Sequence, residues 1–173
     1  GLRIERATSI DELKAAAGDM GNLIRSLYAQ GVKVRFAMDL LAALNKRLMS
    51  KLFNLVVPES VLPHVCLVMM GSEGRGEQIV RIDQDNGLIM RDSLDWPECQ
   101  KTMEYYTQTL VDLGYPRCPG QVMVNNPFWV QPLSEWTQRM RDWVAKADND
   151  SLLNLSISID AHAVAGNKAL FKT

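Results

Sequence analysis

The sequence has 173 residues, enough for one domain with a substantial core. Its apolar fraction is 47 %, its charged fraction is 23 % and its formal net charge is −1, which are ordinary values for a globular protein. This balance argues against a basic surface that neutralises many phosphates, so we do not expect stable binding to DNA or RNA. A nucleotide needs only a local positive site and a metal, and is not excluded.

The cysteines and the apolar runs indicate the compartment. Cys66, Cys99 and Cys118 are odd in number and widely spaced, which excludes a disulfide framework and a paired zinc motif. The longest apolar run, residues 65–70, is too short to span a bilayer, and no signal peptide opens the sequence. We therefore expect reduced thiols, a cytoplasmic location and no membrane association. Gly1 is interpreted as a tag remnant, and the sequence is expected to be a fragment of a longer protein.

Two long helices are predicted first along the chain. Ser9 is a plausible N-cap, and Glu12 three residues later completes a capping box. Apolar residues then recur at helical spacing up to Gly31, and a second helical pattern covers residues 32–55. We expect an antiparallel helical hairpin and assign residues 1–57 to an N-terminal helical segment. This segment either pads one side of the following domain or also links that domain to an upstream regulatory one.

The pattern then changes to short apolar runs separated by turns. Residues 65–70 form a continuous apolar run that is typical of a buried strand, and residues 87–90 form a second one. Residues 97–113 are predicted to be a helix, and residues 121–125 a short strand. The order of strands and helices predicts an α+β (α/β) domain over residues 58–173, with helices packed on one sheet.

The last third of the chain is predicted to contain a helix and a strand. Residues 134–147 have helical periodicity with Ser134 as the cap, and Trp136 and Trp143 lie on the apolar stripe that faces the core. Residues 156–164 alternate between polar and apolar side chains, which predicts a strand.

A glycine-rich stretch follows the first predicted strand and suits phosphate binding. Gly71 permits a tight turn and a close approach to a ligand, and Ser72 offers a hydroxyl and an amide to a phosphate oxygen. Gly74 and Gly76 let backbone amides converge on anionic oxygens, and the Arg75 guanidinium can bind a phosphate through two donors. The stretch is not a Walker loop, because no Gly-Lys-Ser/Thr follows.

Ten residues separate Ser72 from the first of two aspartates that enter the second predicted strand. Asp83 and Asp85 are separated by one residue, so on a strand both carboxylates share a face. Two such carboxylates repel each other unless a cation lies between them, and Mg²⁺ prefers oxygen ligands of this kind. Alone, either motif could be an ordinary turn. Together they predict a site for a metal and a nucleotide.

This combination resembles the nucleotidyltransferase superfamily with a DNA polymerase beta-like palm. The glycine-rich loop is similar to that of the bacterial PII-protein uridylyltransferase. More closely, the chain resembles bacterial nucleotidyltransferases found beside CBS and cyclic-nucleotide-binding-like domains. The matching stretches are residues 71–78, 83–86, 118–123, 126–129 and 160–167.

The resemblance implies transfer of a nucleoside monophosphate from an NTP to an acceptor, with pyrophosphate leaving. It implies Mg²⁺ or Mn²⁺ as the cofactor, a helical hairpin packed on a palm-like mixed sheet, and a bacterial signalling protein. The acceptor is expected to be a protein or a small molecule, and an upstream CBS or cyclic-nucleotide-binding-like domain is expected in the full chain. Two alternatives stay open: a catalytically inactive nucleotide-sensing module, and a helical protein-interaction domain.

A third carboxylate often completes this kind of site. Ser156, Ser158, Asp160 and His162 would share the polar face of the strand predicted over residues 156–164. Asp160 is therefore a candidate third metal ligand or a base that activates the acceptor. The alternative is an edge strand whose polar face meets water, and His162 is expected to be a hydrogen-bonded structural histidine.

Overall fold

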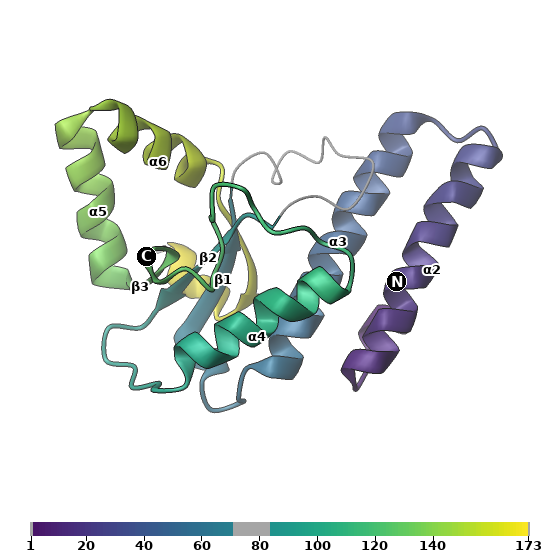
Figure 1. The fold of residues 1–173 in the computed structure, drawn as a ribbon, viewed down its shortest axis with the longest axis horizontal. Helices are drawn as coiled ribbons and strands as arrows, with labels where there is room; N and C mark the ends of the chain where they lie inside the picture. The colour runs from purple at the N-terminus through teal and green to yellow at the C-terminus, as the bar shows by residue number, and fades with distance from the viewer. Residues whose placement is uncertain (1, 71–83, 173) are drawn as a thin grey trace.

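The described residues form a four-stranded mixed sheet with helices on both faces (Figure 1). The structure is a computed structural model that describes residues 2–70 and 84–172. This architecture confirms the predicted α+β fold class. The helices are α1 Leu2–Arg6, α2 Ile10–Ala29, α3 Val34–Val56, α4 Cys99–Asp112, α5 Leu133–Lys146 and α6 Asn149–Ile159; the strands are β1 Val65–Met69, β2 Asn86–Met90, β3 Val130–Pro132 and β4 His162–Gly166; the 3-10 helices are η1 Leu62–His64, η3 Pro127–Trp129 and η4 Lys168–Lys172.

The predicted helical hairpin is confirmed. The Ser9 hydroxyl accepts a hydrogen bond from the Glu12 amide at 3.2 Å, so α2 begins at the predicted cap. The Glu12 carboxylate accepts a hydrogen bond from the Thr8 amide at 2.8 Å, one residue earlier than in a standard capping box. α2 and α3 then lie side by side and antiparallel (Figure 1). α1, a single helical turn that the sequence pattern did not predict, packs against both of them.

The strand order places several strand ends together. The order is β3-β2-β1-β4, in which β1 is antiparallel to both β2 and β4, and β2 is parallel to β3. The carboxyl end of β1 therefore lies beside the amino ends of β2 and β4. Met69 at that end pairs with Asn86 of β2 and with His162 of β4. We call this end of the sheet, marked by Met70, Asp85 and His162, the site edge.

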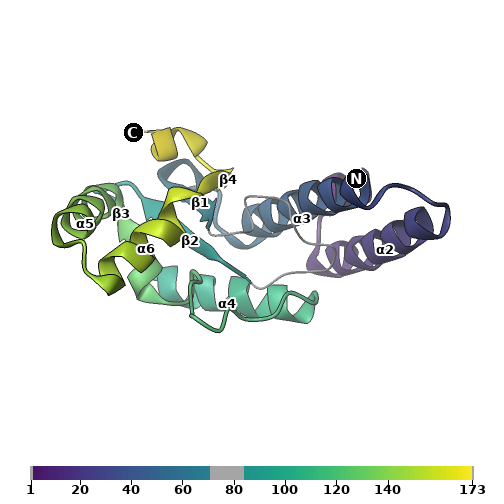
Figure 2. The same cartoon turned by 90° about the horizontal axis from the view of Figure 1, so that it is seen from above.

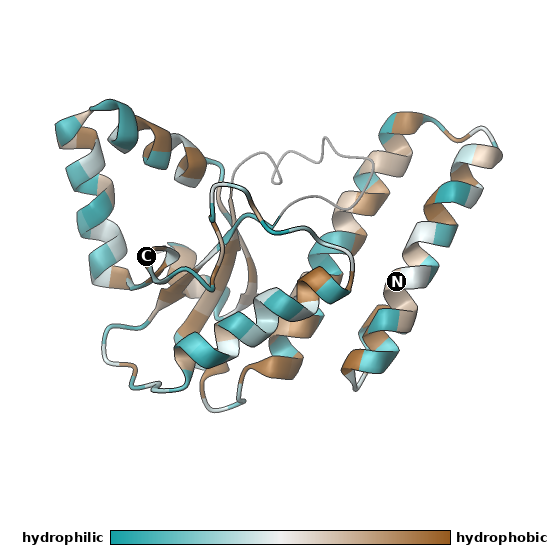
Figure 3. Ribbon diagram, in the orientation of Figure 1, coloured by the Kyte–Doolittle hydropathy of each residue, from teal (hydrophilic) through white to brown (hydrophobic). Residues whose placement is uncertain are grey.

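Alternate residues of β1 face two separate apolar clusters. Val65, Leu67 and Met69 pack into the cluster that includes residues of α1 to α4. Cys66 and Val68 pack into the cluster beneath α5, α6 and η4. All five residues of β1 are buried, which explains why the run is continuously apolar. Figure 2 shows the α2–α3 hairpin on one side of the molecule and α5 and α6 on the other, and Figure 3 shows the strands as the hydrophobic centre.

The aromatic residues near α5 form part of the core, as predicted for Trp136 and Trp143. Both side chains are buried, and the ring of Trp129 lies 6.1 Å from that of Trp136 and 6.5 Å from that of Trp143. The Trp136 indole donates a hydrogen bond to the backbone oxygen of Leu88 at 2.9 Å. This bond ties α5 to the middle of β2.

Two local predictions were wrong. Residues 121–125 form no strand; instead the Asn86 amide donates to the Val122 oxygen at 3.0 Å, and the Asn86 side chain accepts from the Val124 amide at 2.8 Å. Gln121 has a φ of 57°, which interrupts any extended backbone there. Ser134 does not cap α5 either, because α5 begins at Leu133 and the Asp92 carboxylate accepts from the Ser134 amide at 2.9 Å.

The strand predicted over residues 156–164 is also wrong in its first half. α6 continues to Ile159, and β4 begins only at His162. The Asp148 carboxylate caps α6 by accepting from the Ser151 amide at 2.8 Å. The Ser156 and Ser158 hydroxyls donate to carbonyls of the preceding helical turn, at 2.8 and 2.9 Å. The alternation therefore spans a helix end and a strand start, and the proposed common polar face does not exist.

The N-terminal helices share their core with the sheet. Leu13 of α2, Leu48 of α3 and Leu67 of β1 belong to one cluster. The division of the chain at residue 57 stays a prediction. Within the described ranges, no helix combines the length and the apolar character that crossing a bilayer requires.

Candidate functional site

Asp85 lies at the site edge, directly before β2. Its backbone oxygen accepts a hydrogen bond from the Met70 amide at 2.8 Å, which extends the β1–β2 ladder by one pair. Asn86 turns its side chain toward Val124, and strand alternation places the half-buried Asp85 carboxylate on the opposite side of the chain. The β1–β2 pairing thus fixes the backbone position of this predicted metal ligand.

Most of the predicted phosphate-binding residues cannot be placed in the same way. Met70 and Gln84, which flank them in the sequence, both lie at the site edge. Gly71, Ser72, Gly74, Arg75, Gly76 and Asp83 lie outside the described residues. Their roles stay predictions.

Gln84 fixes the chain immediately before Asp85. Its side chain is fully buried, and its amide nitrogen donates to the Thr107 oxygen at 3.1 Å and to the Tyr115 oxygen at 3.3 Å. Its backbone amide also donates to the Pro116 oxygen at 3.0 Å. These bonds attach the start of β2 to the end of α4 and the turn after it. Sequence reasoning missed this role, because nothing local in the sequence identifies the distant carbonyl partners.

Replacing Gln84 with Leu should lower the free energy of unfolding by about 2 kcal/mol, because two buried carbonyl groups lose a hydrogen-bond donor. The change is measured by urea denaturation. Gln138→Leu is the matched control, since Gln138 is exposed on α5 and should change stability by less than about 0.5 kcal/mol. Equal effects of the two substitutions would contradict the assigned role of Gln84.

Asp160 and His162 lie at the same edge, beside β1. Asp160 is the half-buried C-cap residue of α6, and His162 is the first residue of β4. Burial lowers the pKa of His162, and the positive charge of Lys46 on α3 lowers it further. A hydrogen bond to the backbone of Asp160 opposes both effects. His162 is therefore mainly neutral near pH 7, which agrees with its interpretation as a hydrogen-bonded structural histidine.

Lys46→Ala should raise the pKa of His162, while burial still holds it below the ordinary value of 6.5. Imidazole NMR titration measures this directly, and His162→Gln assigns the signal among the two histidines. Because the pKa of His162 is lower in the folded chain than in the unfolded chain, the unfolded chain binds more protons as the pH falls. Protonation of this histidine therefore lowers the free energy of unfolding once the pH falls to 6.5 and below. An unchanged pKa in Lys46→Ala, as expected for the exposed control Lys101→Ala, would contradict the assigned contact.

Cys118 lies next to Asp85 in space although 33 positions separate them in the sequence. Burial raises the pKa of its thiol, and a hydrogen bond to the Asp85 carboxylate raises the pKa further. The thiol is therefore protonated at neutral pH and can orient that carboxylate. The sequence indicated only that this cysteine belongs to a matching stretch, since a single cysteine does not reveal which distant side chain it meets.

The site edge offers carboxylate donors, together with the thiol of Cys118 and the imidazole of His162. Asp85 and Asp160 offer carboxylate oxygens, the ligands that Mg²⁺ and Mn²⁺ favour. Within residues 2–70 and 84–172, no three His, Cys, Asp or Glu side chains are grouped so that they could hold a metal. Asp83, which is predicted to add a further carboxylate, lies outside these residues.

Comparison with known families gives one result. The model of a family described as Putative nucleotidyltransferase DUF294 matches residues 18–150. This match covers α2 from Gly18 onward, α3, β1, β2 and both predicted metal-binding aspartates, Asp83 and Asp85. Comparisons with curated proteins and with solved structures returned no match. Asp160 lies beyond the matched residues, so the match gives no support to its predicted role.

Proposed function

Since the chain belongs to the Putative nucleotidyltransferase family DUF294, we propose that it is a metal-dependent enzyme that transfers a nucleoside monophosphate from an NTP to an acceptor. The observation that carries this proposal is the position of Asp85. It pairs with Met70 at the end of β1, beside the residues that flank the glycine-rich stretch. This is where a carboxylate would have to lie to act together with a phosphate-binding turn.

Each residue of the proposed site has a distinct role. Asp83 and Asp85 bind Mg²⁺ or Mn²⁺, and the stretch from Gly71 to Gly76 holds the triphosphate through Ser72, the backbone amides and Arg75. Asp160 completes the metal site or accepts the proton of the attacking group. When bound, the metal neutralises charge on the phosphate oxygens.

The proposed transfer is an in-line displacement at the α-phosphorus. An acceptor oxygen forms the new bond to phosphorus, the bond to the bridging oxygen of the β-phosphate breaks, and pyrophosphate leaves. The proton of the acceptor passes to a base at the site edge, for which Asp160 is the candidate. Positioning and charge neutralisation supply most of the acceleration, because the protein forms no covalent bond with the nucleotide.

The proposed biological setting follows from the sequence resemblance. The similarity of residues 71–77 to the loop of the PII-protein uridylyltransferase supports UTP as the donor, and the acceptor is a protein or a small molecule. We also propose a bacterial signalling role, a cytoplasmic location and an upstream CBS or cyclic-nucleotide-binding-like domain in the full protein.

The test is to incubate the protein with each of the four NTPs, Mg²⁺ and cell extract, and to measure pyrophosphate release and transfer of an α-phosphate label. We expect release with at least one NTP, and its loss when a chelator removes the metal. Nucleotide binding without release would favour the alternative of an inactive sensing module. Absence of both binding and release would overturn the proposal.

A further inference from the structure

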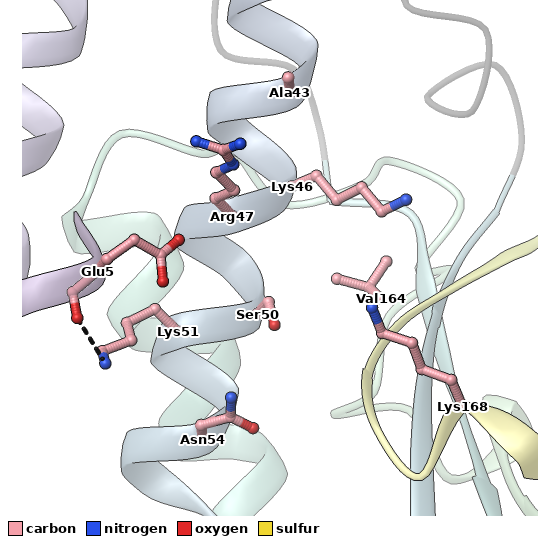
Figure 4. A pocket seen from close by; sticks show the side chains of 9 residues that line it. All are labelled: Glu5, Ala43, Lys46, Arg47, Ser50, Lys51, Asn54, Val164 and Lys168. Atoms are coloured by element: carbon pink, nitrogen blue, oxygen red, sulfur yellow. Dashed lines mark hydrogen bonds between the residues drawn. The ribbon is translucent and has the colours of Figure 1, made fainter. Parts of the chain in front are cut away.

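A basic groove lies between α3 and the edge strand β4. Its cavity volume is about 370 Å³. Figure 4 shows the side chains that line it, which come from α1, α3, β4 and η4. We call it the α3–β4 groove and define it by Lys46, Arg47, Ser50, Lys51, Asn54 and Lys168.

The groove concentrates positive charge in a chain whose net charge is only −1. Among the described residues that line it, four are cationic and one, Glu5, is acidic. The Lys51 ammonium is held at the rim, where it donates to the backbone oxygen of Glu5 at 3.0 Å. In the described part of the chain, no carboxylate forms a salt bridge with Lys46, Arg47 or Lys168.

Two of these cations approach the groove from opposite walls. Figure 4 shows Lys46 of α3 and Lys168 of η4 both extending into the gap between α3 and β4. Two ammonium groups that face one gap repel each other unless an anion lies between them. Ser50 and Asn54, one and two helical turns after Lys46, add a hydroxyl and an amide on the same wall. This set of donors suits the several oxygens of a phosphate group.

The groove also adjoins the site edge. Val164 lines it and lies two residues after His162, which pairs with Met69 at the end of β1. A molecule held in the groove could therefore extend along β4 to the site edge. The limited volume and the near-neutral overall charge favour a small ligand over a nucleic acid or an anionic membrane.

We propose that the α3–β4 groove binds the phosphate group of the acceptor, which is a phosphorylated small molecule distinct from the NTP. This inference rests on the proposed function, because it names the acceptor class for the same site. Lys46 and Lys168 hold the phosphate from both walls. The acceptor then presents its nucleophilic oxygen at the site edge.

Binding is tested first without metal, with inorganic pyrophosphate as the probe and a chelator present, by isothermal titration calorimetry. The double variant Lys46→Ala/Lys168→Ala should weaken binding about tenfold or more, because two charged donors are lost. The control Lys14→Ala/Lys101→Ala removes the same charge from exposed positions on α2 and α4, and Asp85→Asn alters the site edge alone. Both should bind within about twofold of the unmodified protein.

A second measurement separates the groove from the NTP site. Binding of an NTP with Mg²⁺ should be kept in Lys46→Ala/Lys168→Ala and weakened in Asp85→Asn. In the turnover assay with phosphorylated acceptors, the double variant should raise the KM for the acceptor and leave the KM for the NTP unchanged.

Several outcomes would overturn the proposal. In the calorimetric test, these are unchanged pyrophosphate binding in the double variant or equal weakening in the lysine control. Loss of NTP binding in the double variant would also overturn it. So would a groove that binds an oligonucleotide or an anionic vesicle but does not bind pyrophosphate. Pyrophosphate binding in the presence of a chelator does not require turnover. A failure of the proposed enzyme activity is therefore distinguishable from a failure of the groove assignment.

Discussion

Asp85→Asn should abolish Mg²⁺-dependent NTP turnover, with a loss of about a thousandfold or more in kcat. A neutral amide is a much weaker ligand for a divalent cation than a carboxylate, and metal-assisted charge stabilisation contributes several kcal/mol to such transition states. Asp83→Asn should have the same effect if the two aspartates hold the metal together. The measurement is pyrophosphate release at saturating NTP and metal.

The matched control for this prediction is Asp95→Asn. Asp95 is exposed and follows the opposite end of β2, so its substitution should leave turnover unchanged. Thermal unfolding of both variants separates a lost ligand from a lost fold, because Asp85 is only half-buried and its backbone pairing with Met70 does not need the carboxylate. Full activity in Asp85→Asn would show that the assigned role is wrong.

Gly166→Ala should have the largest effect on stability, lowering the free energy of unfolding by about 3 kcal/mol or more. Gly166 ends β4 with a φ of 77°, a conformation that residues with a Cβ rarely adopt. A Cβ there would lie 2.3 Å from the backbone oxygen of Val65, which also accepts a hydrogen bond from the Asn167 amide at 2.7 Å. The substitution must therefore separate β4 from the start of β1.

Gly18→Ala is the control for this prediction. Gly18 lies within α2, and a Cβ at this position would meet no atom within 4 Å. This change should stabilise the protein by up to about 1 kcal/mol, because alanine favours the helix. Chemical denaturation of the two variants should thus give shifts of opposite sign. A Gly166→Ala variant as stable as the unmodified protein would contradict the described β1–β4 pairing.

The elements that the sequence predicted correctly are those with strong local signals. The capped periodic pattern from Ser9 predicted α2, and the unbroken apolar run after His64 predicted β1, because each pattern extends over the whole element. The strand predicted over residues 156–164 failed because its alternation is short. So short an alternation is compatible with a helix end as well as with a strand. The Asp148 cap stabilises the helix, and the Ser156 and Ser158 hydroxyls donate to carbonyls within it.

The candidate site was predictable only in part, for a related reason. Asp85 could be placed because it adjoins an apolar strand within a recognisable motif. The contacts around it come from distant segments: Gln84 binds carbonyls near the end of α4, Cys118 meets the Asp85 carboxylate, and Lys46 reaches His162 from α3. Such contacts depend on how α3 and α4 pack on the sheet, which no local pattern specifies.

The central claim is that Asp83 and Asp85 together hold a divalent cation beside the nucleotide. The most direct measurement is a crystal structure of the protein with Mn²⁺ and a non-hydrolysable NTP, in which anomalous scattering locates the metal. We expect manganese bonded to both carboxylates and to phosphate oxygens of the nucleotide. Manganese bound elsewhere, or nucleotide bound with the two carboxylates pointing apart, would contradict the claim.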